Sequence, residues 1–183
     1  MARLVLLNGP PGVGKSTLAR RYADAHPLTL ALEIDAVRAM LGDWLEDAER
    51  SGPAARRLAV AMAREHLRRG HDVIVPQLLT RREFVEELRA LAEDAGAGFV
   101  EIALLDEREA TLERARLRDE PAGGFSARAL VARQGSSLEA AYDGFVAALE
   151  ARPDAVVIDA AGDPYEALAA VLARIREFPP AGG

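Results

Sequence analysis

The segment that follows the first apolar run has the residue types and spacing of a phosphate-binding loop. Its sequence is Gly9-Pro10-Pro11-Gly12-Val13-Gly14-Lys15-Ser16-Thr17, which fits the pattern G-x-x-x-x-G-K-[ST]. Glycines allow successive backbone N–H groups to point at phosphate oxygens, and Lys15, the only lysine of the chain, would reach the β- and γ-phosphates. The hydroxyl of Ser16 is placed to bind Mg²⁺. An apolar strand before the loop and a helix after it argue against a chance match, so the segment predicts binding of ATP with Mg²⁺.

A carboxylate and an arginine follow a second apolar segment. We expect residues 30–35 to form a strand that ends at Asp35, and ligands of parallel α/β sheets lie beyond the carboxyl ends of the strands. Asp35 would therefore share a crevice with the loop and could accept a proton from an attacking hydroxyl. Arg38, one helical turn further on, could hold a substrate anion or the γ-phosphate. The alternatives are that Asp35 only caps a helix over 36–41 and that Arg38 is a solvated surface residue.

Two arginines, Arg114 and Arg118, share one face of an expected helix over 107–119, whose Leu112, Ala115 and Leu117 can face the core. The segment Pro121-Ala122-Gly123-Gly124 breaks this helix. Arginines beside a flexible segment suit a lid, over about residues 118–136, which would bring positive charge onto a transferring phosphoryl group. The alternative is an exposed helix with Glu–Arg pairs.

These candidate residues are separated by alternating strand and helix patterns. Strands are predicted at 3–8, 30–35, 72–76, 99–105 and 155–159, and helices at 15–25, 36–41, 54–69, 81–95, 107–119, 126–134, 137–150 and 164–178. Residues 44–53 are acidic and contain Ser-Gly-Pro, which suggests an irregular surface excursion, and 179–183 suggest a loose tail. The alternation predicts one α/β domain over residues 1–183, with a five-stranded parallel sheet covered by helices on both faces.

Composition narrows the class of protein. The net charge of −6 disfavours broad electrostatic binding of a nucleic-acid backbone, although a strand end stays possible as an acceptor. Cysteine is absent, which excludes disulfides and thiolate metal sites and suits the cytoplasm. No stretch approaches the roughly 20 apolar residues of a membrane helix, so we expect no membrane partner. The guanine-recognition sequence Asn-Lys-x-Asp does not occur, which favours ATP over GTP, and the oligomeric state has no signal in the sequence.

The loop, the Asp35–Arg38 pair and the Arg114–Arg118 pair together resemble the small P-loop kinases, in particular polynucleotide 5′-hydroxyl kinase, chloramphenicol phosphotransferase and the zeta-toxin-like kinases. Ile34-Asp35-Ala36-Val37-Arg38 is similar to the D-x-x-R of the polynucleotide kinases, in which the aspartate is the general base. The resemblance implies a three-layer P-loop NTPase fold with sheet order 2-3-1-4-5 and a helical lid. It also implies that Arg114 and Arg118 bind nucleotide, that Arg118 is catalytic through contact with the γ-phosphate, and that the loop containing Gly162 packs near adenine.

One departure from these kinases concerns the end of the third strand. Many of them carry an aspartate there, whereas this chain has Val75-Pro76-Gln77. Either Mg²⁺ relies on Ser16, water and Asp35, or Gln77 hydrogen-bonds a polar, uncharged acceptor. We expect an ATP-dependent phosphotransferase that acts on a hydroxyl of a small molecule, such as an antibiotic or a metabolite. A polynucleotide or nucleoside 5′-hydroxyl kinase, and a regulatory ATPase without an acceptor, are the alternatives.

Overall fold

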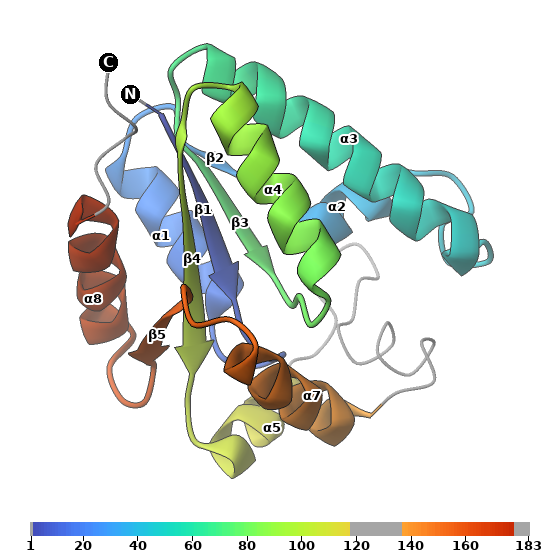
Figure 1. The fold of residues 1–183 in the computed structure, drawn as a ribbon. Helices are drawn as coiled ribbons and strands as arrows, with labels where there is room; N and C mark the ends of the chain where they lie inside the picture. The colour runs from blue at the N-terminus through green and yellow to red at the C-terminus, as the bar shows by residue number, and fades with distance from the viewer. Residues whose placement is uncertain (1, 118–136, 178–183) are drawn as a thin grey trace.

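The computed structural model describes residues 2–117 and 137–177, which contain a five-stranded, all-parallel sheet in the order β2-β3-β1-β4-β5 (Figure 1). Its strands are β1 (Arg3–Asn8), β2 (Leu30–Ala31), β3 (Val73–Gln77), β4 (Gly98–Leu105) and β5 (Val156–Asp159). The helices of the described residues are α1 (Lys15–Ala25), α2 (Ile34–Ala39), α3 (Ala48–Arg68), α4 (Arg82–Asp94), α5 (Arg108–Leu117), α7 (Leu138–Glu150) and α8 (Pro164–Glu177). The predicted α/β class and the predicted strand order are confirmed.

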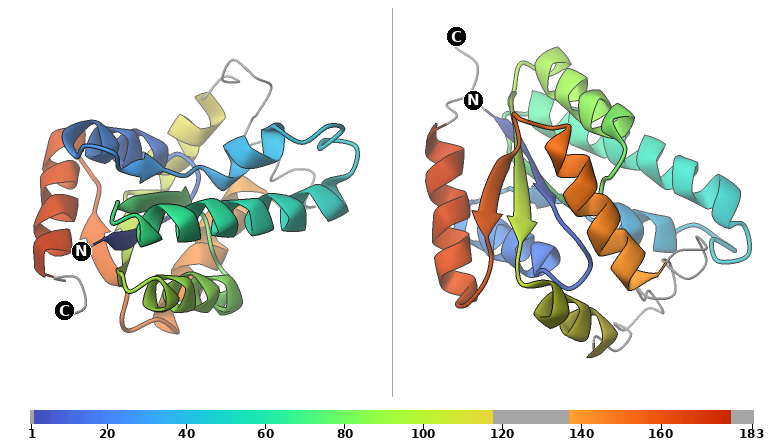
Figure 2. Two further views of the ribbon diagram at one scale, coloured as in Figure 1. Left: turned by 90° about the horizontal axis from the view of Figure 1, so that it is seen from above. Right: turned by 60° about the horizontal axis from the view of Figure 1, so that its bottom comes forward.

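Two apolar cores lie on opposite faces of the sheet, because successive side chains of a strand point to opposite faces. Leu4 and Leu6 of β1 pack with α2, α3 and α4, whereas Val5 and Leu7 pack with α1 and α8. Figure 2 shows the resulting three layers, with the sheet between the two groups of helices. Both faces are covered, which explains why β1 and β3 are almost wholly apolar.

Helices α5 and α7 lie at the end of the sheet where β1 and β4 finish (Figure 1). A small third cluster joins them through Leu112, Ala115 and Leu138. The hydroxyl of Tyr142 donates to the backbone oxygen of Asp106 at 2.8 Å. Leu117 is 72% exposed, so the expectation that it faces the core is wrong, because α5 buries only the stripe that contains Leu112 and Ala115.

The predicted strand over 30–35 is wrong beyond Ala31. Strand β2 has only two residues, and Ile34 begins α2, so Asp35 stands in the first turn of a helix rather than at the end of a strand. Leu30, Leu32 and Ile34 alternate as in a strand, but Ile34 and Val37 also have helical spacing and are buried beside α3. At this edge of the sheet, packing against α3 outweighs further pairing with β3.

The irregular excursion predicted over 44–53 is also wrong for its second half. Helix α3 begins at Ala48, and the carboxylate of Asp47 caps it by accepting from the backbone N–H of Arg50 at 3.1 Å. Pro53 therefore lies inside α3, where it removes one backbone donor without ending the helix. The predicted helix over 126–134, the lid, Arg118 and the tail lie outside the described residues. Within the described ranges, no helix is both long enough and apolar enough to span a membrane.

Candidate functional site

The glycine-rich loop connects the end of β1 to the start of α1, at the carboxyl end of the sheet (Figure 1). Gly14 precedes α1 in a left-handed conformation, with φ of 97°. Gly12 has φ of 88°, and a Cβ at this position would lie 2.2 Å from the backbone oxygen of Thr111 and 2.9 Å from the backbone nitrogen of Ala115. Gly12 therefore serves the close approach of α5 to the loop, a role that the sequence pattern alone did not show.

The loop side chains divide into those that support the fold and those that lie beside the crevice. Val13 is 6% exposed and packs in the core with α1, so its side chain supports the loop from below. The ammonium of Lys15 donates to the backbone oxygen of Pro10 at 2.8 Å. Ser16 Oγ donates to Glu33 Oε2 at 3.4 Å. Thr17 is exposed.

Asp35 lies partly buried at the same end of the sheet, and its pKa is raised above the usual range. Burial is the main cause, and the negative charge of Glu33 adds to it. A hydrogen bond from the Gln77 amide and the positive charges of Arg38 and Lys15 act in the opposite direction. The structure thus brings Asp35 together with Lys15 of the loop and Gln77 of β3. The sequence predicted that Asp35 and the loop share a crevice.

The Gln77 side chain has one amide atom in use and one without a partner. Its amide nitrogen serves Asp35, whereas Oε1 is buried and accepts no hydrogen bond from any of the residues that the structure describes. A buried amide oxygen without a donor is unfavourable, by about 1–3 kcal/mol. A donor that reached this atom would remove that cost.

Arg38 is 6% exposed, so the alternative that it is a solvated surface residue is wrong. Its Nε donates to Ser51 Oγ at 2.9 Å, and its guanidinium carbon lies 5.7 Å from the centre of the Trp44 ring. Ser51 Oγ in turn donates to the backbone oxygen of Trp44 at 2.9 Å. The alternative that Asp35 caps its helix is wrong too, because the N-cap position belongs to Glu33.

Arg114 lies against the loop, whereas its predicted partner Arg118 lies outside the described residues. Arg114 Nε donates to the backbone oxygen of Gly12 at 3.1 Å, and its guanidinium pairs with Asp106. This arginine therefore connects α5 to the loop. Gly162 stands in an exposed turn before α8, with φ of 93°.

Sequence reasoning missed a buried polar network that supports the loop. Asn8 Oδ1 accepts from the backbone N–H groups of Gly9 at 3.0 Å and Leu79 at 2.8 Å. Asn8 Nδ2 donates to Glu101 Oε1 at 2.8 Å, and Arg152 donates to Glu101 at 2.6 Å and to the backbone oxygen of Leu79 at 2.6 Å. The sequence carries one signal of this network. Glu101 is a lone charge within the apolar strand β4, and a buried charge requires a partner.

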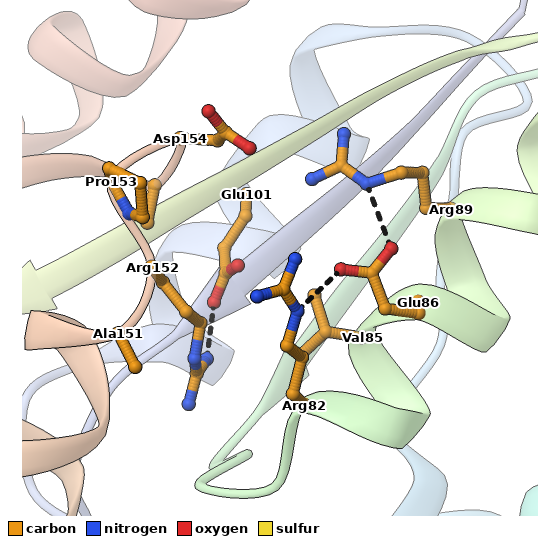
Figure 3. Close-up of a pocket in the computed structure, with 10 residues that line it drawn as sticks. Arg82, Val85, Glu86, Arg89, Glu101, Ala151, Arg152, Pro153 and Asp154 are labelled. Atoms are coloured by element: carbon orange, nitrogen blue, oxygen red, sulfur yellow. Dashed lines mark hydrogen bonds and ion pairs between the residues drawn. The ribbon is translucent and has the colours of Figure 1, made fainter.

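Arg152 and Glu101 also border a small cavity of about 80 Å³ between α4 and the segment before β5 (Figure 3). On the α4 side, Glu86 pairs with Arg82 at 3.1 Å and with Arg89 at 3.5 Å. These ion pairs occupy the guanidinium groups on both sides of the cavity. We assign this cavity to the support of the fold.

The residues at the crevice fit a Mg²⁺–nucleotide complex. Magnesium prefers oxygen ligands and usually keeps several waters while it binds one or two carboxylates and substrate phosphates. Ser16 and Asp35 supply such oxygens beside the loop. Among residues 2–117 and 137–177, no group of three His, Cys, Asp or Glu residues forms a metal site by itself. The cation would therefore be held jointly by the protein and the nucleotide phosphates.

Several solved structures share this fold. A tunicamycin resistance protein from Deinococcus radiodurans is 18% identical, with a TM-score of 0.65 and coverage of 100% of both chains. A sugar kinase from Janibacter sp. HTCC2649 is 21% identical, with a TM-score of 0.66 and coverage of 99% of this chain and 98% of the other. A gluconokinase from Sinorhizobium meliloti 1021 is 21% identical, with a TM-score of 0.55 and coverage of 96% and 94%.

The chain shares the fold of these structures, and its sheet has the order that the resemblance to the small P-loop kinases implied. None of the curated proteins matches the chain. The model of the family described as "AAA domain" matches residues 4–142, which is more than half of the 183 residues. The chain belongs to this AAA domain family.

Proposed function

We propose that the protein is an ATP-dependent phosphotransferase that moves the γ-phosphoryl group to a hydroxyl of a small molecule. One observation carries the proposal: a partly buried carboxylate with a raised pKa, Asp35, lies close enough to Lys15 of the phosphate-binding loop for the two charges to interact. A carboxylate placed beside bound phosphates can receive the proton of an attacking hydroxyl. The loop supplies the donor half of such a site, and Asp35 supplies the acceptor half.

In this mechanism the loop binds the β- and γ-phosphates through backbone N–H groups, and Lys15 leaves the Pro10 oxygen to reach them. Mg²⁺, when bound, offsets charge on the phosphates. Asp35 orients the acceptor hydroxyl and takes its proton as the new O–P bond forms and the bond to ADP breaks. Arg114, which already contacts Gly12, and Arg118 of the proposed lid stabilise the charge on the phosphoryl group. We place all of this within a single domain over residues 1–183.

The acceptor is inferred from Gln77 and from the negative net charge. Oε1 of Gln77 offers one buried hydrogen-bond acceptor beside Asp35, which suits a polar, uncharged molecule with a second donor near its reacting hydroxyl. The net charge of −6 disfavours a polyanionic strand as the acceptor. The kinship of fold with a sugar kinase, a gluconokinase and a tunicamycin resistance protein supports the same choice.

The direct test offers the purified protein γ-³²P-labelled ATP and Mg²⁺ with four panels: sugars and polyols, hydroxylated antibiotics, nucleosides, and oligonucleotides with 5′-hydroxyl ends. We expect label in a sugar or antibiotic product, and roughly 10²–10⁴-fold slower labelling with Asp35→Asn. Label on oligonucleotide ends would replace the small-molecule acceptor with a strand end. ATP hydrolysis without transfer in any panel would favour a regulatory ATPase.

A further inference from the structure

Glu33 is a carboxylate at the crevice to which the proposed reaction assigns no role. It is partly buried and precedes α2, yet its side chain makes no capping hydrogen bond to the helix backbone. Ser16 Oγ donates to its Oε2 at 3.4 Å. Its charge also raises the pKa of Asp35, so Glu33 lies close to both residues.

The end of β3 shows what the site lacks. Gln77 is the last residue of β3 and pairs in register with Asn8, the residue just before the glycine-rich loop. The side chain that β3 presents next to the loop is therefore a neutral amide, which binds Mg²⁺ more weakly than a carboxylate does. A protein carboxylate for a cation at Ser16 would therefore come from another strand or loop.

We propose that Glu33 supplies this carboxylate and holds the Mg²⁺ of the bound nucleotide together with Ser16. Neighbouring ligands of an octahedral Mg²⁺, with bonds of about 2.1 Å, lie about 3 Å apart. The separation of 3.4 Å between Ser16 Oγ and Glu33 Oε2 is close to that spacing. The inference rests on the proposed function, because it concerns the metal of the ATP complex.

A consequence in charge makes the role testable without any acceptor. In the absence of metal, the carboxylate of Glu33 repels the phosphates of a nucleotide bound at the loop. With metal, the same carboxylate attracts the cation that the phosphates carry. Glu33→Gln therefore weakens binding of the magnesium complex and strengthens, or leaves unchanged, binding of the free nucleotide. A residue with a merely structural role would weaken both.

The experiment measures binding of a non-hydrolysable ATP analogue by isothermal titration calorimetry, in excess Mg²⁺ and in EDTA. For the wild type we expect tighter binding with Mg²⁺. For Glu33→Gln we expect affinity for the magnesium complex to fall about 10- to 100-fold, with no loss in EDTA. Glu33→Asp, which keeps the charge, should recover part of the affinity. Glu83→Gln, an exposed residue in the first turn of α4, is the matched control and should behave as the wild type.

The outcomes separate this inference from the proposed function. If the wild type gains affinity from Mg²⁺ and Glu33→Gln gains as much, Glu33 is not a metal-binding residue, while the proposed kinase activity stands. An equal loss in Mg²⁺ and in EDTA would also overturn the inference, because it would indicate damage to the loop. If the wild type binds no nucleotide under either condition, the proposed function falls and the inference falls with it.

Discussion

At the scale of single residues, Asp35 has two effects: it serves as the proposed base, and its burial affects the stability of the folded protein. Its raised pKa means that folding stabilises the neutral carboxyl relative to the carboxylate, compared with the unfolded chain. Its contribution to stability is therefore present below its unfolded pKa and is lost as the pH rises through its folded pKa. At neutral pH the ionised group destabilises the protein while it serves as the base.

Asp35→Asn should separate these two effects. We expect turnover to fall by roughly 10²–10⁴-fold, because the amide cannot accept the proton. Nucleotide affinity should stay near that of the wild type. The free energy of unfolding at neutral pH should rise by about 0.5–2 kcal/mol, because no charge is then buried. Urea unfolding and the transfer assay test this, with the exposed Asp24→Asn as control. A variant that transfers phosphoryl groups at the wild-type rate would remove Asp35 from the role of base.

The neighbours of Asp35 should shift its pKa in opposite directions. The hydrogen bond from Gln77 lowers this pKa, so Gln77→Ala should raise it further. The charge of Glu33 raises it, so Glu33→Gln should lower it. Carbon-13 titration of the Asp35 carboxyl measures both shifts directly. Because the base must be ionised, the acidic limb of the pH–rate profile should move up in Gln77→Ala and down in Glu33→Gln. Shifts of the same sign would contradict this arrangement of the site.

At the scale of elements, the close contact between α5 and the glycine-rich loop is the most constrained feature of the site. Helix α5 contacts Gly12 through its backbone, and Arg114 repeats the connection through its side chain. The loop cannot shift outward without moving α5. The segment proposed as a lid follows α5 in the sequence. Helix α5 therefore connects the loop to that segment.

Gly12→Ala should disrupt this contact. The added Cβ would meet backbone atoms of α5, which cannot rotate away, and the residue would also keep a positive φ. We expect a loss of about 3 kcal/mol or more in the free energy of unfolding, together with weaker nucleotide binding. Gly70→Ala is the matched control, because Gly70 has φ of 84° and nothing within 4 Å of its added Cβ. It should lose only about 1 kcal/mol. Equal losses in the two variants would show that strain alone, without the α5 contact, explains the effect.

At the scale of the whole molecule, the network of Asn8, Glu101 and Arg152 connects segments that are distant in sequence. It joins the end of β1, the segment after β3, the middle of β4 and the connection between α7 and β5. Glu101 and Arg152 are both nearly inaccessible to water. Removing one member of such a pair leaves the other charge buried without its partner.

Arg152→Met should therefore be strongly destabilising, by about 3–5 kcal/mol, and Glu101→Gln similarly so. The double variant should lose less than the sum of the two, because it leaves no buried charge. Arg69→Met, which breaks an exposed pair with Glu65, should lose no more than about 1 kcal/mol. Urea unfolding of the four variants measures the coupling. Additive losses would show that the two residues act independently.

The alternation of strand and helix patterns predicted the parallel sheet, and the loop motif predicted that Lys15 and Asp35 share a crevice, because both signals depend on local spacing. The sheet order came from the resemblance to the small P-loop kinases. The sequence did not predict that Asp35 lies in a helix, since Ile34 fits both the alternation of Leu30 and Leu32 and a helical spacing with Val37, and only packing against α3 decides between them. Glu33 and Arg152 were missed because their roles depend on neighbours that are distant in sequence. The start of α3 was predicted too late, at residue 54 after Pro53, because Asp47 caps the helix and α3 begins at Ala48.

The position of Lys15 in the loop, where it donates to the backbone oxygen of Pro10, has a practical consequence for experiments with this protein. Lys15 carries the only side-chain amine of the 183 residues, so amine-reactive reagents have one side-chain target, and it lies in the loop. Coupling to a sensor surface through lysine would block the site under study. Because this single side-chain amine lies in the loop, acylation of Lys15 directly measures how much of the loop is occupied by nucleotide. A bound nucleotide should slow the reaction. Peptide mass spectrometry after brief acylation, with and without nucleotide, would report binding before any acceptor is known.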